Sequence, residues 1–447
     1  MNNRRFARTA GWLALPCLVA AGLLAWYVTR EPATAFEQEQ AGASFEPALV
    51  SRGEYVARLS DCVACHSLAG KAPFAGGLEM ATPLGAIHAT NITPDKNTGI
   101  GTYSLADFDR AVRHGVAPGG RRLYPAMPYP SYVKLSDDDI KALYAFFMQG
   151  IQPANQPNIP SDIPWPLNMR WPIALWNGVF APTATYAAKP DQDALWNRGA
   201  YIVQGPGHCG SCHTPRGLAF NEKALDESGK PFLAGALLDG WYAPSLRQDP
   251  NTGLGRWTEP QIVQFLKTGR NAHAVVYGSM TEAFNNSTQF MQDDDLAAIA
   301  RYLKSLPGDP QRDGTPWQYQ AVSTNQDVPG ARTYATRCAS CHGLDGKGQP
   351  EWMPPLAGAT SALAKESASA INITLNGSQR VVAAGVPDAY HMPAFREQLS
   401  DQEIAEVLSY VRGTWGNNGG AVEAKAVGKL RGHTDPASSS PIILHMR

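Results

Sequence analysis

One five-residue pattern occurs three times in this chain of 447 residues: two cysteines, separated by two residues and followed directly by a histidine. The copies span Cys62–His66, Cys209–His213 and Cys338–His342. C-x-x-C-H is the attachment site of a c-type haem, whose iron takes a proximal histidine as an axial ligand. A domain that contains such a motif must fold around a large, covalently held cofactor. The pattern therefore predicts three covalently bound haem c groups.

The motifs account for six of the seven cysteines, and the seventh, Cys17, lies in an N-terminal apolar run. The predicted thioether positions are Cys62, Cys65, Cys209, Cys212, Cys338 and Cys341, and the predicted proximal iron ligands are His66, His213 and His342. Zinc is the alternative, because C-x-x-C is also half of a tetrathiolate site. Such sites need a second cysteine pair nearby, whereas these pairs are more than a hundred residues apart.

The second axial ligand decides what each iron can do, since methionine raises the reduction potential and closes the iron to substrates. Each repeat has a methionine shortly before its last helix, at 61, 67 and 50 residues after the motif histidine: Met127, Met280 and Met392. A single methionine could simply fill space in the core. Three at one place in three repeats favour iron ligation, with Met291 and His391 as alternatives nearby.

The three repeats share an order of predicted elements: helix, haem motif, loops, short helix, methionine loop and terminal helix. The first two also share a loop, Asn97–Gly101 and Asn251–Gly255, that the third lacks. Acidic residues or serines open each terminal helix, and Ser400 with Glu403 fits a capping box. Strand signals are sparse, so the predicted fold class is mainly α with three tandem domains.

The predicted domains cover residues 46–150, 191–308 and 326–416, followed by a C-terminal tail at 417–447. The linker at 151–190 holds eight prolines and three tryptophans. That composition is too rich in proline for a helix and too aromatic for a freely solvated linker. We expect this segment to lie along a protein surface, on this chain or on a partner.

Residues 1–35 are predicted to be a signal peptide or an N-terminal membrane anchor. An apolar stretch of about 19 residues, Ala10–Val28, is long enough to span a bilayer. Ala33–Ala35 offers a cleavage site, and both cleavage and retention remain open. Three basic residues precede the stretch: Arg4, Arg5 and Arg8. Their position predicts that the remainder lies outside the cytoplasm.

The sequence contains no pattern typical of a dehydrogenase active site. No glycine-rich dinucleotide fingerprint follows a strand, and no nucleophile and base form a recognisable pair. We therefore predict no catalytic residue and expect the organic chemistry to occur on another subunit. The net charge of −1 does not favour nucleic acid as a partner.

The three motifs, the Asn97–Gly101 loop and the run from Met392–Phe395 to Trp415–Asn417 make residues 46–416 resemble a known family. That family is the tri-haem cytochrome c subunit of bacterial membrane-bound dehydrogenases. The resemblance implies three class I-type cytochrome c domains, with the six histidines and methionines above as axial ligands. It also implies a flavoprotein or quinoprotein catalytic subunit that oxidises an alcohol, gluconate or another sugar or polyol.

The same resemblance implies that electrons pass to ubiquinone and the respiratory chain, on the periplasmic side of the bacterial cytoplasmic membrane. Two alternatives remain open. A similar tri-haem subunit can accept electrons from a molybdenum hydroxylase that oxidises aldehydes or N-heterocycles. A stand-alone haem enzyme would instead need an iron with an open or labile site, and three well-placed methionines argue against it.

Overall fold

The computed structural model describes residues 18–38, 44–322, 327–388, 390–438 and 444–446. Its internal contacts divide the chain into two compact units. Unit 1 comprises residues 1–53 and 75–186, and unit 2 comprises 54–74 and 187–447. Unit 2 thus holds the second and third repeats together with the first haem motif. The predicted bounds of three separate domains remain a prediction.

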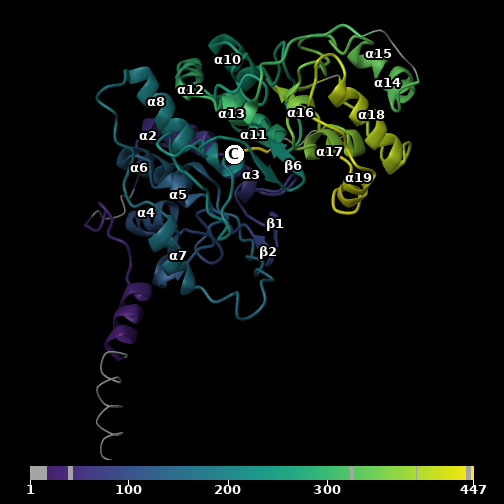
Figure 1. The fold of residues 1–447 in the computed structure, drawn as a ribbon. Helices are drawn as coiled ribbons and strands as arrows, with labels where there is room; N and C mark the ends of the chain where they lie inside the picture. The colour runs from purple at the N-terminus through teal and green to yellow at the C-terminus, as the bar shows by residue number, and fades with distance from the viewer. Residues whose placement is uncertain (1–17, 39–43, 323–326, 389, 439–443, 447) are drawn as a thin grey trace, which may run out of the picture. The chain divides into compact units, whose positions relative to one another are not determined.

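Unit 1 is built mainly from short helices (Figure 1), and aromatic side chains form part of its core. Phe108, Tyr144 and Phe147 meet edge-on or tilted at that core, with ring centroids 5.6 to 6.0 Å apart. The elements in chain order are α2 (Pro47–Leu59, which continues into unit 2), β1 (Glu79–Thr82), β2 (Gly85–His88), α4 (Leu105–His114), β3 (Val116–Ala117), η1 (Pro118–Gly120), β4 (Arg121–Arg122), α5 (Tyr129–Tyr132), α6 (Asp137–Ala145), η2 (Phe146–Gly150) and α7 (Pro172–Phe180).

Unit 2 continues the same pattern, and within the described residues each sheet of the two units is a two-stranded hairpin. The mainly α prediction is therefore confirmed. The elements of unit 2 are α3 (Cys62–His66), α8 (Ala194–Gln204), α9 (Gly210–His213), β5 (Ala236–Leu238), β6 (Trp241–Ala243), α10 (Glu259–Thr268), α11 (Met280–Asn286), η3 (Thr288–Phe290), α12 (Asp293–Ser305), α13 (Pro310–Asp313), α14 (Ala331–Arg337), α15 (Ala339–His342), α16 (Thr360–Leu363), α17 (Ala368–Asn376), β7 (Val382–Ala383), β8 (Val386–Pro387), α18 (Asp401–Gly413) and α19 (Ala424–Arg431).

In each repeat a glycine in the helix before the haem motif, or at the N-cap of that helix in the third repeat, lies against the terminal helix. A methyl group on Gly53 would lie 1.9 Å from the carbonyl oxygen of Ala142, and one on Gly199 would lie 2.0 Å from that of Ala298. Gly330 approaches the carbonyl of Glu406 in the same way, at 2.2 Å. Any larger residue would push the two helices apart. The three repeats therefore share one helix-crossing geometry.

The linker prediction was partly wrong, because residues Pro172–Phe180 form helix α7. Proline is tolerated at the first turn of a helix, where the missing N–H has no intrahelical partner anyway. No other proline occurs before Pro182, so the nine residues can form helical hydrogen bonds. The expectation that this segment lies along a protein surface is confirmed. The hydroxyl of Tyr129 donates to Asn177 at 2.7 Å, and the amide of Tyr186 donates to the carbonyl of Lys134.

The C-terminal tail contains helix α19, which packs against α17 and α18 (Figure 1). Val427 of α19 is fully buried in the core of the third repeat. Arg396 donates hydrogen bonds to the carbonyls of Arg431 and Thr434, which ties the end of the helix to the loop after Met392. The tail up to about residue 437 is thus part of the third repeat's fold.

The N-terminal prediction is only partly covered by the described residues. Residues 18–29 form a helix with exposed apolar side chains, while residues 1–17 lie outside the described part. Among the residues that the structure describes, none of the helices combines the length and the apolar character needed to span a bilayer.

Candidate haem sites

Short helices carry the haem motifs and place the two cysteines of each about one turn apart. α3 holds Cys62, Cys65 and His66, and α9 and α15 each begin directly after the first cysteine of their motif. Residues three apart lie on the same face of a helix, so both thiols can reach one planar ligand. Burial raises the pKa of the Cys62, Cys65 and Cys209 thiols to about 12. By surface area, however, Cys212 and Cys341 are exposed and the other four motif cysteines are half-buried.

Two of the three predicted proximal histidines are held by backbone carbonyls. Nδ1 of His213 lies 2.7 Å from the carbonyl oxygen of Pro244, and Nδ1 of His342 lies 3.0 Å from that of Pro354. A carbonyl can only accept, so Nδ1 carries the proton and Nε2 keeps its lone pair for a metal. Burial lowers the pKa of both histidines and favours the neutral form that iron requires. His66 ends α3 and is half-buried.

The predicted distal methionines are all half-buried. Met280 is the first residue of α11 and packs against buried Val276 and Phe284. The backbone of Met392 exchanges two hydrogen bonds with Ser378, and its side chain packs against the core of the third repeat. Unit 2 therefore contains both predicted ligands of the second haem and of the third. Met127 lies in unit 1, whereas His66 lies in unit 2.

The two alternative ligands have different surroundings. Met291, two residues before α12, is 4% exposed, and its carbonyl accepts a hydrogen bond from Lys267 of α10. His391 is exposed on the surface of the loop before Met392. Met291 is therefore a core residue and His391 a surface residue. Both positions are less suitable for an iron ligand than those of the half-buried methionines. The assignment of axial ligands stays a prediction.

The first and second haem motifs are neighbours within unit 2. Nε2 of His208, just before the second motif, lies 3.3 Å from the carbonyl oxygen of Ser60, just before the first. The thiols of Cys65 and Cys212 are close enough that charge on Cys212 contributes to raising the pKa of Cys65, after burial and two nearby carboxylates. The first and second attachment helices therefore lie close together in unit 2.

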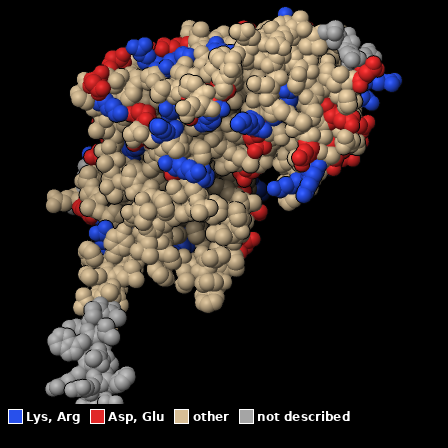
Figure 2. Space-filling model, in the orientation of Figure 1, with Lys and Arg blue, Asp and Glu red and all other residues tan. Residues whose placement is uncertain are grey.

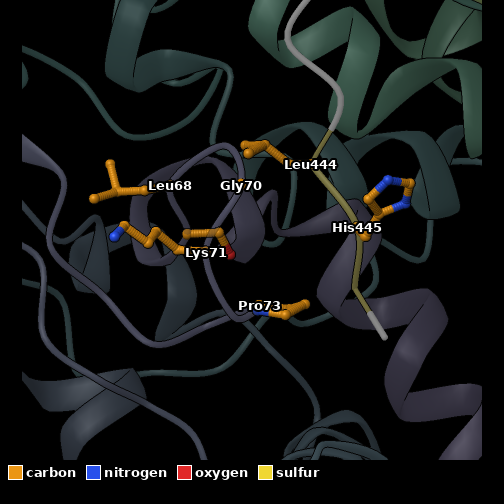
Figure 3. A pocket seen from close by; sticks show the side chains of 7 residues that line it. Leu68, Gly70, Lys71, Pro73, Leu444 and His445 are labelled. Carbon is orange, nitrogen blue, oxygen red and sulfur yellow. The ribbon is translucent and has the colours of Figure 1, made fainter. Parts of the chain in front are cut away.

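A hollow of about 180 Å³ adjoins the loop after the first motif (Figure 3). Leu68 and Lys71 line it from that loop, and Leu444 and His445 line it from the C-terminal end of the chain. The C-terminal residues thus lie beside the first haem motif, although the chain between them and α19 includes undescribed positions. Among the described residues no three His, Cys, Asp or Glu side chains converge as they would around a bare metal ion.

The cytochrome c family model matches this chain three times, at residues 50–150, 197–307 and 328–415. The chain belongs to the cytochrome c family. It carries three covalently bound haem c groups, as predicted from its motifs. We call the three matched segments the first, second and third domains.

Relatives of this cytochrome are subunits of larger enzymes. It is 48% identical over 406 residues to the cytochrome c subunit of a quinone-type alcohol dehydrogenase from Gluconacetobacter polyoxogenes. That alignment covers 88% of this chain and 86% of the relative. It is 50% identical over 402 residues to the gluconate 2-dehydrogenase cytochrome c subunit of Pantoea cypripedii, covering 86% and 90%. It is also 37% identical over 420 residues to one of the nicotinate dehydrogenase subunits of Pseudomonas putida, covering 91% of this chain but 33% of that relative.

The residues present fit a c-type haem in the second and third domains. Each of these domains has two cysteines about one helical turn apart, a histidine whose Nδ1 faces a backbone carbonyl, and a half-buried methionine. Sequence reasoning did not find the carbonyls of Pro244 and Pro354. These prolines follow their histidines by 31 and 12 residues, so no constant spacing identifies them.

Proposed function

We propose that this cytochrome is the electron-transfer subunit of a dehydrogenase complex. It takes electrons from a flavoprotein or quinoprotein catalytic subunit that oxidises an alcohol, gluconate or another sugar or polyol. The observation that carries the proposal is the similarity of nearly the whole chain to the cytochrome c subunits of two such dehydrogenases. Those relatives serve different substrates, so the shared part is the transport of electrons.

The chain's own residues hold and tune the redox groups. Each pair of cysteines would hold a haem through two thioethers. In the second and third domains the carbonyls of Pro244 and Pro354 hold Nδ1 of His213 and His342, which would leave Nε2 for iron. The predicted methionine ligands would favour the reduced state and would leave no position for substrate. A c-type haem bound in this way supplies one-electron oxidation and reduction. Apolar side chains around such a haem would exclude water and so raise its reduction potential.

A second candidate is an electron-acceptor subunit for a molybdenum hydroxylase that acts on an aldehyde or N-heterocycle. The similarity to the nicotinate dehydrogenase of Pseudomonas putida favours it. That similarity is weaker in identity, and this chain spans only a third of the length of that relative. We therefore rank it below the first proposal.

We also propose that one face of unit 1 lies on the periplasmic surface of the cytoplasmic membrane, where ubiquinone is the electron acceptor. The hydroxyl of Tyr27, in the helix at 18–29, approaches Gly178 of α7, so these two helices adjoin. Both expose large apolar side chains, and so does the loop before α7: Leu18, Val19, Leu23, Trp26, Trp165, Leu167, Trp171 and Val179. Tryptophans are enriched where proteins meet the membrane interface.

Charge is scarce on this face, which is the second support for a membrane location. Between Asp162 and Lys189 the only charged residue is Arg170. Its guanidinium lies 3.5 Å from the centre of the Tyr124 ring and donates to the carbonyl of Arg122, so it turns inward. Figure 2 shows few charged side chains on the surface next to the N-terminal helix. A bilayer interface tolerates such a surface better than water does.

Co-purification from solubilised membranes tests the main proposal. A tagged chain should bring down a flavoprotein or quinoprotein dehydrogenase in a fixed ratio, identified by mass spectrometry. A molybdenum hydroxylase in its place would establish the second candidate. The membrane proposal predicts that replacing Trp165 and Val179 by glutamate weakens flotation of the cytochrome with vesicles, whereas Leu237→Glu in β5 does not.

A further inference from the structure

A small hydrophobic cluster in unit 2 is shared between the second and third domains. Val276 and Phe284 of the second domain and Val381 of the third are buried, with exposed fractions of 2%, 1% and 6%. Met280, the predicted distal ligand of the second haem, packs against this cluster. The cluster against which Met280 packs therefore includes a residue of the third domain, Val381, which stands just before β7.

Two side-chain amides of the second domain bind the same strand. The amide of Val382 donates to Oδ1 of Asn285 at 2.8 Å, and Nδ2 of Asn285 donates to the carbonyl of Arg380. Gln289 repeats the arrangement: its Nε2 donates to the carbonyl of Val382, and its Oε1 accepts from the amide of Ala384. We call Asn285 and Gln289 the amide clamp. It pairs with the strand as a neighbouring strand would.

Further contacts hold the same two segments together. Arg270 of the second domain lies 3.3 Å from the carboxylate of Asp388 in the loop after β8, and Asp388 is largely buried. The guanidinium of Arg270 also lies 4.2 Å from the centre of the Trp352 ring. On the other side of the methionine loop, Ser369 of α17 exchanges hydrogen bonds with the backbone of Tyr242 in β6, and the ring of Tyr277 packs against Trp241 of the same strand. The loop that presents Met280 is thus bounded by the third domain on two sides.

We infer that the β7–β8 hairpin of the third domain completes the distal wall of the second haem site. The amide clamp and Val381 are positioning residues: they fix α11, the helix that begins with Met280, and keep water from that side. Water near the iron would stabilise the more positively charged oxidised form and lower the reduction potential. The potential of the second haem then depends on the third domain. This inference rests on the proposed ligation by Met280.

The hairpin offers its own matched control. Val381 is buried in the cluster against which Met280 packs, whereas Val386 in β8 is 68% exposed. Val381→Ala removes apolar cover from the methionine, and Val386→Ala removes the same number of atoms from the hairpin's outer side. Gln289→Ala opens half of the clamp at a half-buried position and leaves the hydrophobic cluster intact. It therefore keeps the test open if Val381→Ala folds poorly.

The experiment is a spectroscopic redox titration of the full-length holo-protein. Met280→His assigns the second haem, because exchanging methionine for histidine lowers the potential of that haem alone. Val381→Ala and Gln289→Ala should lower the reduction potential of the same haem. The equilibrium between its oxidised and reduced forms should shift toward the oxidised form by about threefold to tenfold. The upper limit corresponds to about 59 mV for one electron. Val386→Ala should leave all three components in place.

The possible failures are distinguishable. If Met280→His moves no component, the ligand assignment is wrong and the inference falls with it. If Met280→His moves one component but Val381→Ala and Gln289→Ala leave that component unchanged, the hairpin does not form part of the wall. An equal shift in Val386→Ala would assign the effect to general loosening of the hairpin and would also overturn the inference.

Discussion

Nδ1 of His213 donates a hydrogen bond to the carbonyl oxygen of Pro244 across 2.7 Å, and His342 makes the same bond to Pro354 at 3.0 Å. A backbone carbonyl serves this purpose in both domains, although the two prolines stand at different distances along the chain. The bond fixes the imidazole's tautomer and orientation, and it increases the electron density that Nε2 offers to iron. This contact leaves Nε2 as the nitrogen of each imidazole that can bind iron.

The first prediction concerns this histidine. Replacing His213 by glycine removes the ligand and leaves room for a free imidazole in its place. The low-spin spectrum of the second haem should be lost and should return when imidazole is added. His273→Ala, which removes a ring stacked on Trp257 in the same domain, should leave the spectrum unchanged. A low-spin signal that persists in His213→Gly without imidazole would refute the assignment.

The second prediction separates Met392 from its neighbour. Met392→Ala should lower the potential of the third haem by at least about 59 mV, a tenfold change in its redox equilibrium, and should slow electron flow. Haem attachment should continue, because both cysteines and His342 remain. Potentiometric titration and the methionine-to-iron charge-transfer band report the change. His391→Ala is the control, and if it produced the larger shift His391 would be the ligand.

The third prediction tests the covalent attachment. The double variant Cys338→Ser with Cys341→Ser should lose one covalent haem, which intact-mass spectrometry of the denatured protein measures directly. Ser340→Ala, an exposed position between the two cysteines, should keep all three haems. Three covalent haems in the double variant would show that the third motif is not an attachment site.

The fourth prediction concerns Asp295 of α12, which binds residues of α2 and α8. Asp295 accepts hydrogen bonds from Arg198 at 2.7 and 2.8 Å and from the hydroxyl of Tyr55 at 2.7 Å. Burial alone would raise the pKa of Asp295, but the bonds from Arg198 and Tyr55 outweigh it and lower that pKa. Asp295→Asn should cost about 1–3 kcal/mol of stability at neutral pH. Partial exposure of Arg198 favours the lower end of that range.

The sign of the pH dependence follows from the lowered pKa. A carboxyl group whose pKa is lower in the folded state stabilises the fold above its unfolded-state pKa, near 4, and loses that contribution as pH falls through the folded value. The difference in unfolding midpoint between the wild type and Asp295→Asn should therefore shrink below about pH 4. Asp294→Asn, its exposed neighbour, should cost little at any pH. A constant difference across pH would contradict this account.

Local signals made much of the fold predictable. The predicted capping box is present: the side chain of Ser400 accepts from the amide of Glu403, and the carboxylate of Glu403 accepts from the amide of Ser400. The helices after the shared loops are α4 and α10, and both begin with capping boxes. Such features depend on residues three or four apart, so the sequence displays them directly.

Features that depend on distant partners could not be predicted. Any residue offers a carbonyl, so nothing in the sequence singles out Pro244 as the partner of His213. Asn285 and Val382 are 97 residues apart, and an asparagine in a helix carries no sign that it will bind a strand of another domain. Helix α7 was missed because the overall proline content hid a stretch between Pro172 and Pro182 that can form helical bonds.

The most direct test of the account is substrate-driven reduction of the haems in the purified complex. The catalytic subunit's substrate, added without any mediator, should reduce all three haems in stopped-flow spectra, and a soluble ubiquinone analogue should reoxidise them. The variant with Met392→Ala should slow one of these two phases. Haems that remain oxidised while the same preparation reduces an artificial dye would show that electrons do not pass through this cytochrome.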